Sequence, residues 1–501
     1  MSTSNRLVLH GLDSDTVPSE VPPDTWTAAT NMITRQGFMS RLAGIFDEQV
    51  ADVDVNLFYV PFNYGAGSGI RLGAGKASVD VYSSVGGINI DVTGTWAAPS
   101  LTTGGITGGT VNNLPIINHV GQVPYYYPGA PAANVLPIPT GGNTWPATQR
   151  AAVLRCWKYH IFIGNVTQGA VIYPDMVMWS NAATPTSGLP TEWVATNTND
   201  SRIITLADTP GAVVDFFPLR DQLVVFKHDS MYVLTYTGGN NVFNTRKVTE
   251  SFGIASRHCA VDIGGRLAVL TSGGDVVVTD GQSMQSIATK RVLKQIAAIG
   301  TVLTGWLAFN ELTSDLYVAP AASGTLPRQA FVYNTVTQLW GNTALTSETL
   351  NTAGISYASY VSRVGTASGA MQMAGLNQIS TGLASQYVLI DSGTTFASGA
   401  TIQGVLTRED YDGGEPDAVK TLSGVRLNGS TGTAGALVEI RVGARMLEGD
   451  TLTYGPWVTV DTTGYANLFA TGRLLSFQLR SSIPGFQVQG FTVIWGVTSA
   501  Y

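Results

Sequence analysis

The chain has 501 residues, and its 27 Lys and Arg against 34 Asp and Glu give a formal net charge of −7. Charged residues make up 12% of the chain, about half the globular average, while 44% are hydrophobic, so the composition excludes a disordered polyelectrolyte. Glycine is enriched at 57 residues but follows no three-residue period, which excludes collagen. The length favours two or three domains over a single core.

The Lys and Arg residues are too few and too scattered for sequence-independent binding of nucleic acid, which needs clustered cations. The tightest basic group is Lys290 and Arg291 with Lys294. The N-terminus lacks the basic and apolar layout of a signal peptide, and the uncharged stretch 295–310 is too short and too polar to cross a bilayer, so we expect no membrane segment. Sparse charge also indicates a surface that is either neutral and polar or covered by other subunits.

The first element expected along the chain is a short helix in the segment 1–45, which would brace the fold. Asp24 follows two prolines and precedes Trp26, Ala29 and Ile33, a spacing that places the apolar residues on one face of a capped helix. Such a helix is too short to be stable alone in water. We therefore expect Trp26 to be a packing anchor, with a contact to a partner subunit as the alternative.

A glycine-rich stretch comes next, at residues 65–78. It contains Gly75 and Lys76, but a phosphate-binding loop would need Gly in place of Ile70 and Ser or Thr in place of Ala77. We expect a flexible hairpin turn there instead of a nucleotide site.

The segment between Val92 and Gln149 contains no Asp, Glu, Lys or Arg. This composition is typical of irregular strands and long loops over the fold, which is the reading we favour. The alternative is an arm that packs on a neighbouring subunit.

Three twelve-residue stretches share one pattern of apolar strand, polar turn and apolar strand, at 223–234, 267–278 and 307–318. Their starts lie 44 and 40 residues apart, close to the length of one four-stranded propeller blade. A hairpin cannot bury its apolar face alone, so such units gain stability by stacking on their neighbours. The repeats predict a β-propeller over 46–391, with unrelated hairpins in a β-sandwich as the alternative.

The last part of the chain, 392–501, has strand-like runs that lie closer together and alternate more regularly between apolar and polar residues. This pattern predicts a separate β-sandwich-like domain. A second short helix is expected within 285–298. The expected fold class is all-β: a β-propeller with an additional C-terminal β-sandwich-like domain and very few helices.

The residues predict no catalytic, cofactor or metal site. Cys156 and Cys259 are too few for a disulfide framework or a zinc site, and we expect two free buried thiols. The five histidines do not have the spacing of metal ligands. These residues are His10, His119, His160, His228 and His258.

Two groups of carboxylates are weaker candidates. The acidic run from Glu409 to Asp417 lacks the twelve-residue calcium pattern and reads as a turn between strands. Asp208, Asp215 and Asp221 are compatible with a glycosidase, but sequence spacing cannot fix the separation of their carboxyl groups.

Residues 200–290 resemble the tail nozzle, or tail tubular protein B, family of short-tailed double-stranded DNA bacteriophages. Other stretches along nearly the whole chain also resemble this family, and they occur in the same order as in the family. They are VPPDTWTAATNMITRQGFMSRLAGI near the start, YPDMVMWSNAATP at 173–185, AFVYNTVTQLWGN at 330–342, YVLIDSGTTFASGATIQGVLTRE at 387–409 and RLLSFQLRSSIPGFQVQGFTVIWG at 473–496. The chain departs from the larger members of the family in length, since it leaves little room for a long distal tip.

The resemblance implies a structural virion protein without enzymatic activity or cofactor. It implies a homohexameric ring below the tail adaptor protein, with a propeller in each subunit, contacts to tail fibres, and an axial channel for double-stranded DNA that is not bound sequence-specifically. The virion's short tail would be assembled in the bacterial host cytoplasm. Any gate in the channel should consist of loops, with 92–149 and 65–76 as candidates and no residue assigned. A modest excess of acidic residues would repel the DNA phosphates and so let the DNA slide without binding to the channel wall.

The alternative function is a propeller-type tail protein that binds a glycan or receptor. It predicts aromatic and Asp or Asn clusters at the same offset in each blade. The aligned repeats have Asp229, Gly273 and Thr313 at one such offset, which does not match this expectation. A glycan-cleaving propeller would instead hydrolyse host polysaccharide.

Overall fold

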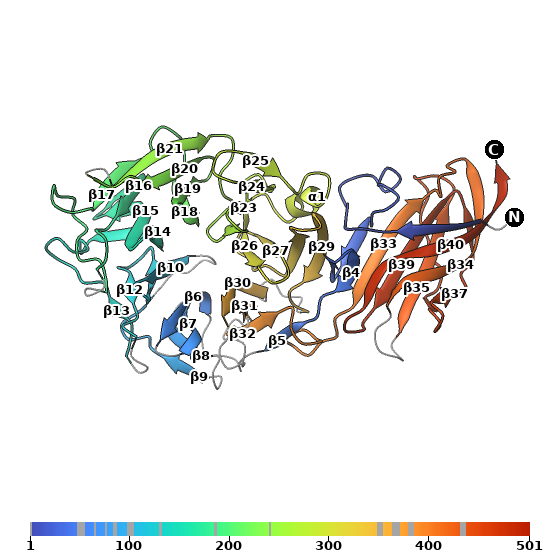
Figure 1. Ribbon diagram of the computed structural model, residues 1–501, viewed down its shortest axis with the longest axis horizontal. Coiled ribbons are helices and arrows are strands. Elements are labelled where there is room, and N and C mark those ends of the chain that lie inside the picture. Colours follow the sequence, from blue (N-terminus) through green and yellow to red (C-terminus); the bar gives the residue numbers. More distant parts are fainter. Residues whose placement is uncertain are drawn as a thin grey trace.

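Seven four-stranded antiparallel units follow one another in chain order around a common axis within the described residues (Figure 1). Six are separate sheets, and another forms one end of an 11-stranded sheet. The computed structural model describes residues 3–47, 56–64, 67–75, 78–83, 88–97, 105–129, 133–184, 188–239, 242–347, 354–362, 371–378, 385–430 and 437–500. The chain is an all-β propeller.

The first four blades each consist of four consecutive strands. Blade 1 comprises β6 (Asn56–Tyr64), β7 (Gly67–Gly75), β8 (Val79–Ser83) and β9 (Ile88–Asp91). Blade 2 comprises β10 (Ile106–Val111), β11 (Leu114–His119), β12 (Tyr125–Tyr126) and β13 (Leu136–Pro137). Blade 3 comprises β14 (Gln149–Trp157), β15 (His160–Gln168), β16 (Val171–Trp179) and β17 (Arg202–Thr205). Blade 4 comprises β18 (Val213–Leu219), β19 (Gln222–Lys227), β20 (Met231–Tyr236) and β21 (Phe243–Thr249).

The last three blades complete the ring. Blade 5 comprises β22 (Ala260–Asp262), β23 (Leu267–Leu270), β24 (Val276–Thr279) and β25 (Met284–Ser286). Blade 6 comprises β26 (Leu303–Asn310), β27 (Asp315–Ala322), β28 (Gln329–Asn334) and β29 (Leu339–Ala344). Blade 7 comprises β30 (Gly354–Ser362), β31 (Met371–Gln378), β32 (Ser385–Ile390) and β5 (Ile45–Asp47). The innermost strands β6, β10, β14, β18, β22, β26 and β30 contact one another in cyclic order, so the ring is closed.

Two of the three sequence repeats occupy the same place in their blades, and the other does not. The stretches 223–234 and 267–278 form the second and third strands of blades 4 and 5, whereas 307–318 spans the first and second strands of blade 6. Every hairpin within a blade has apolar strands around a polar turn, so the pattern alone cannot fix which pair of strands it marks. The propeller was predicted correctly, although one repeat is out of phase by one strand.

The predicted helix after Asp24 is wrong. The segment instead forms β2 (Ala28–Thr30), β3 (Met32–Arg35) and β4 (Phe38–Arg41), and Asn31 separates the first two with a φ of 55°. Ala29 and Ile33 are both buried, but they belong to different hydrophobic clusters. Their helical spacing therefore reflects burial in two separate places.

Residues 3–8, 404–430 and 437–500 build two sheets that pack face to face, together with β2 and β4. One sheet has the order β2, β33 (Gly404–Tyr411), β39 (Leu474–Ser481), β35 (Val438–Arg445) and β36 (Val458–Thr459). The other contains β4, β40 (Gln487–Ala500) and β34 (Ala418–Ser430), with β1 (Thr3–Val8) on β40 and both β37 (Tyr465–Ala466) and β38 (Ala470–Gly472) on β34. Phe477 and Phe491 meet between the sheets with ring centroids 4.9 Å apart.

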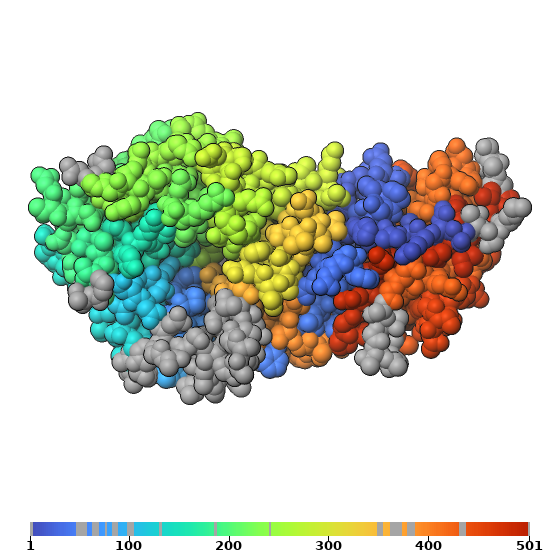
Figure 2. Space-filling view, in the orientation of Figure 1, coloured from blue at the N-terminus to red at the C-terminus, as the bar shows by residue number. Residues whose placement is uncertain are grey.

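The N-terminal segment joins the two parts of the molecule. Met32 on β3 pairs with Asn342 at the edge of blade 6, β3 pairs with β4, and Met39 on β4 pairs with Val488 of the sandwich. Blade 6 and one sandwich layer are therefore a single 11-stranded sheet. In Figure 2 the blue N-terminal segment lies between the yellow blade 6 and the red sandwich, along the long axis of the molecule.

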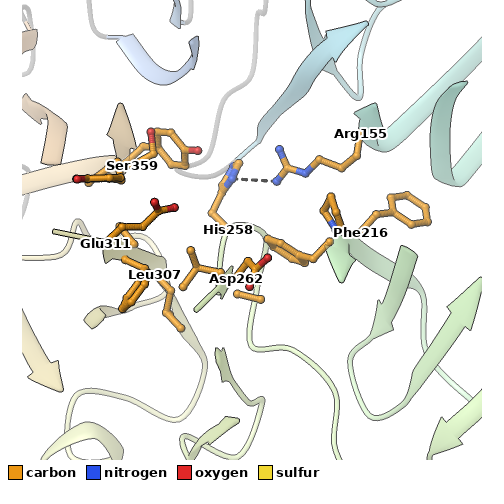
Figure 3. A pocket seen from close by; sticks show the side chains of 16 residues that line it. Arg155, Phe216, His258, Asp262, Leu307, Glu311 and Ser359 are labelled. Atoms are coloured by element: carbon orange, nitrogen blue, oxygen red, sulfur yellow. Dashed lines mark hydrogen bonds between the residues drawn. The ribbon is translucent and has the colours of Figure 1, made fainter. Parts of the chain in front are cut away.

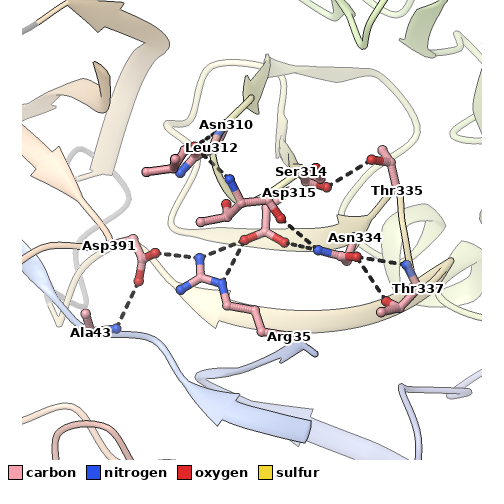
Figure 4. A network of polar contacts seen from close by, with 11 residues as sticks. Arg35, Ala43, Asn310, Leu312, Ser314, Asp315, Asn334, Thr335, Thr337 and Asp391 are labelled. Carbon is pink, nitrogen blue, oxygen red and sulfur yellow. Dashed lines mark hydrogen bonds and ion pairs between the residues drawn. The ribbon is translucent and has the colours of Figure 1, made fainter. Parts of the chain in front are cut away.

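A buried ion-pair network, which we call the junction cluster, holds this segment to two blades (Figure 4). Arg35 on β3 contacts Asp315 of blade 6 at 2.7 Å and Asp391 after blade 7 at 2.5 Å. Asp315 also accepts a hydrogen bond from Asn334, and Asp391 accepts one from the backbone N–H of Ala43. Three segments that are far apart in sequence are thus fixed to one another.

One short helix, α1 (Leu293–Ala297), lies inside the predicted range 285–298. Asp15 accepts hydrogen bonds from the backbone N–H groups of Leu293 and Lys294 at its start. No helix in the described ranges has both the length and the apolar character needed to cross a membrane.

Candidate functional site at the propeller axis

Side chains from the innermost strands fill the middle of the propeller axis, and we call this group the axial cluster. Its members are Phe58 on β6, Arg155 on β14, Asp215 on β18, Tyr357 on β30, and His258, which directly precedes Cys259 and β22. These residues can meet because they lie on or next to the strands nearest the axis, where the seven blades converge.

His258 is the centre of the axial cluster. Its Nδ1 lies 3.0 Å from Arg155 Nη2, and its Nε2 lies 3.0 Å from the carbonyl oxygen of Ile106. Because a carbonyl can only accept, Nε2 carries the proton and Nδ1 accepts from Arg155. Burial, together with the Arg155 charge, lowers the pKa of His258 to about 3. The ring is therefore neutral at physiological pH.

Arg155 and Asp215 form a two-point ion pair beside this histidine. Arg155 Nε and Nη2 lie 2.8 Å from the two carboxylate oxygens of Asp215, whose side chain is fully buried. The backbone N–H of His258 also donates to Asp215 at 3.0 Å. Burial opposes ionisation of Asp215, but the Arg155 charge and these hydrogen bonds lower its pKa below the ordinary value.

Aromatic rings pack around the polar centre and close the axis. Phe58 stacks on His258 with centroids 4.9 Å apart, and Tyr357 meets His258 edge-on at 5.0 Å. Blade 2 contributes the Ile106 carbonyl and blade 6 the N–H of Leu307, which donates to the His258 carbonyl at 2.9 Å. Each of the seven blades thus contributes a group to the axial cluster, and the propeller axis is occupied where they meet.

A cavity of about 360 Å³ opens on the side where β26 and β30 end. Figure 3 shows Asp262 and Glu311 across this cavity from Arg155, with Ser359 on a third side. Phe217, among other apolar groups, completes the wall. The cavity therefore has carboxylates toward its mouth and a neutralised arginine at its base.

The sequence candidates for catalysis lie apart from one another. Asp215 belongs to the axial cluster, Asp208 binds the Tyr232 hydroxyl at 2.6 Å, and Asp221 is exposed beside Lys158. The structure does not bring these three carboxylates together, so they form no opposed pair for glycoside hydrolysis. The role of Asp215 could not be found from sequence, because its partner Arg155 is 60 residues away in the chain.

The remaining candidates have structural surroundings. Asp410 of the acidic run pairs with Arg445, and Cys156 and Cys259 are free thiols whose pKa values burial raises to about 12. His160 is buried and contacts the Ser180 carbonyl. Among the residues described, no group of three or more His, Cys, Asp or Glu side chains could hold a metal ion.

Both regions considered as gate loops contain blade strands. Residues 67–75 form β7 in blade 1, where a turn was expected, and Arg71 there is fully buried among three tyrosine rings. The other region, 92–149, contains the four strands of blade 2, β10 to β13. The expected turn positions 65, 66, 76 and 77 lie outside the described residues.

Comparison with known proteins gave matches among solved structures. Neither protein-family models nor curated proteins matched the chain. Among solved structures, BamB from Moraxella catarrhalis aligns over 68% of this chain and 100% of that chain, with 9% sequence identity and a TM-score of 0.35. The propeller assignment rests on the sheet order and on the closed ring of inner strands.

Proposed function

We propose that the chain is a structural subunit of the nozzle of a short phage tail. In this proposal about six copies form a ring below the tail adaptor protein, and double-stranded DNA passes through the lumen without sequence-specific binding. The ring acts as a conduit and gate for genome ejection, without catalysing a reaction. The proposal starts from the family resemblance of the sequence.

The observation that carries the proposal is the continuous sheet from blade 6 through β3 and β4 into the sandwich. A wall segment of a tube has to resist bending between its parts, and a shared sheet with ladder hydrogen bonds resists it better than a flexible linker. The junction cluster adds charged hydrogen bonds at the same place. The subunit is thus built as one long body.

The occupied propeller axis determines where a conduit could run. Arg155, His258 and Tyr357 meet on the axis, and the cavity beside them is about 360 Å³, far too small for a duplex. In the proposal DNA therefore passes between subunits around the ring's own axis. Each propeller serves as a solid wall element, and the gate consists of loops that face the lumen.

Exposed apolar side chains offer surfaces for contacts between subunits. On blade 3, Val171 and Ile172 near the β15–β16 turn are 53% and 64% exposed, and Ile203 on β17 is 45% exposed. On the sandwich, Leu447 and Phe469 are 59% and 78% exposed. Apolar side chains at interfaces would agree with the sparse charge of the chain.

The mass of the purified protein, alone and with its adaptor, tests the proposal. We expect a ring of about six chains, visible by native mass spectrometry and electron microscopy, with a lumen wide enough for a duplex. A protein that stays monomeric with the adaptor present and binds host glycan would contradict the proposal.

The sign of the lumen potential tests the conduit separately. The proposal expects acidic and neutral groups along the lumen, since like charges repel the phosphates over about 10 Å. A lumen lined mainly by Lys and Arg in the assembled ring would contradict unhindered sliding of DNA.

A further inference from the structure

The cavity that has Arg155 at its base carries two carboxylates toward its mouth (Figure 3). Asp262 is the last residue of β22 and Glu311 directly follows β26, so they come from the neighbouring blades 5 and 6. Both residues are exposed, and neither forms an ion pair with a residue that the structure describes. Asp262 accepts a hydrogen bond only from the backbone N–H of Gly265, at 2.7 Å, within the same described part of the chain. The mouth is therefore a place where a cation can bind.

The positive charge at the base of the cavity is already paired. Arg155 holds the carboxylate of Asp215 through two hydrogen bonds of 2.8 Å. His258, which also lines the cavity, is neutral because burial, together with the Arg155 charge, lowers its pKa to about 3. Among the described lining residues, the other charged side chains are those of Asp262 and Glu311. A ligand thus meets unpaired charge at the two carboxylates.

The rest of the cavity wall is largely apolar and aromatic. It includes Phe217 on β18, Phe309 on β26 and Tyr360 on β30, all of them half-buried. Burial raises the pKa of Tyr360, and the Glu311 charge acts in the same direction, so the Glu311 carboxylate lies near this ring. Aromatic ring faces attract ammonium groups, and the rings also remove methylene groups from water.

This set of groups suits an organic cation better than a metal ion. Calcium takes about six to eight oxygen ligands, and magnesium requires a nearly ideal octahedral arrangement. No group of three or more His, Cys, Asp or Glu in the described ranges could hold a metal ion. Two separate carboxylates can instead accept charge-assisted hydrogen bonds from two ammonium groups of one molecule. The apolar wall would then cover the alkyl chain between those groups.

We propose that this cavity binds an aliphatic di- or polyamine, with Asp262 and Glu311 accepting hydrogen bonds from its ammonium groups and the aromatic wall covering its methylene chain. The volume of about 360 Å³ lies in the usual range of small-molecule pockets, about 300–1,000 Å³. The lining residues all belong to one chain, so the site depends neither on ring assembly nor on the function proposed above.

Calorimetric titration of the full-length protein with spermidine, against ammonium chloride at equal ionic strength, tests the site. We expect saturable binding of one spermidine per chain and no saturable binding of ammonium. Glu311→Gln and Asp262→Asn should each weaken spermidine binding at least about tenfold, because hydrogen bonds to charged groups contribute that much or more. Both positions are exposed, and the amide oxygen introduced by Asp262→Asn can still accept from the Gly265 N–H, so both variants should fold.

The matched control is Asp229→Asn, which removes an exposed carboxylate of blade 4 outside the cavity and should leave the affinity unchanged. Phe309→Leu keeps both carboxylates and should still weaken binding about two- to fivefold, because a ring face is lost. Magnesium chloride should bind more weakly than spermidine. The proposal would be overturned by the absence of saturable binding to the wild type, by unchanged affinity in the Glu311, Asp262 or Phe309 variants, or by tighter binding of magnesium.

Discussion

The axial cluster and the junction cluster each contain a buried arginine paired with carboxylates, but they connect different parts of the molecule. At the axis, Arg155 and Asp215 lie on neighbouring blades, and their side chains are 13% and 0% exposed. At the junction, Arg35 is 25% exposed and bridges two carboxylates from blades 6 and 7 to the N-terminal segment. The axial pair closes the inside of one ring, whereas the junction pair connects the ring with the sandwich.

This difference predicts which property of the protein depends on each cluster. Loss of a partner at the axis leaves a deeply buried charge, so its cost should appear as global stability of the propeller. Arg35 is itself partly exposed, and Asp315 and Asp391 keep hydrogen bonds from Asn334 and from the Ala43 N–H when it is lost. The cost of losing Arg35 should therefore be smaller and appear as loss of coupling between the two parts.

The largest expected effect is that of Asp215→Ala. It leaves Arg155 and the backbone N–H of His258 without their buried acceptor, which should destabilise the protein by about 3–5 kcal/mol. Urea denaturation monitored by tryptophan fluorescence measures the change. The control Asp229→Ala removes an exposed carboxylate and should cost less than about 1 kcal/mol. Equal effects of the two variants would show that the axial cluster is not held as described.

The second effect is that of Arg35→Met, with an expected cost of about 2–4 kcal/mol after allowance for its partial exposure. Asp315 keeps the hydrogen bond from Asn334, so the loss is smaller than at the axis. The variant should separate the unfolding of sandwich and propeller into two calorimetric transitions. A single transition at a lower temperature would mean that the shared sheet alone couples the two parts.

The third prediction concerns the pH dependence of stability that His258 contributes. Burial lowers the pKa of His258 from 6.5 to about 3, so the unfolded chain binds the proton first as the pH falls. The stability is fully present above pH 6.5 and decreases toward pH 3, by up to about 1.4 kcal/mol per pH unit. Below about pH 4 the lowered pKa of Asp215 adds a loss of the same sign.

His258→Asn provides the matched variant for this pH profile, because Asn tolerates the φ of 67° at this position. We expect a lower stability at pH 7 and a flatter slope between pH 6 and 4. His119 and His160, whose pKa values burial also lowers, should keep part of the slope. An unchanged slope would mean that the pKa of His258 is the same in the folded and the unfolded protein.

Much of the fold could be predicted from the sequence, because hairpin patterns at blade length report local alternation and burial. The axial cluster could not be predicted in the same way. His258 and Asp215 were visible as residue types, but Arg155 joins them across 103 and 60 positions, and no local pattern encodes such a meeting. The helix expected around Ala29 failed for a related reason, since two separate cores produced a helical spacing by coincidence.

The smallest expected effect is that of removing the ion pair between Lys158 and Asp221, which has the same charges as the axial pair but lies at the surface. Their atoms lie 3.4 Å apart, and the Asp221 side chain is 96% exposed. Water and salt screen such a pair, so a double-mutant cycle with Lys158→Ala and Asp221→Ala should give a coupling below about 1 kcal/mol. The same cycle at Arg155 and Asp215 should give several times more, because burial removes the screening. Similar couplings at both places would mean that water reaches the propeller axis, and the solid wall element proposed for the ring would then lose its physical basis.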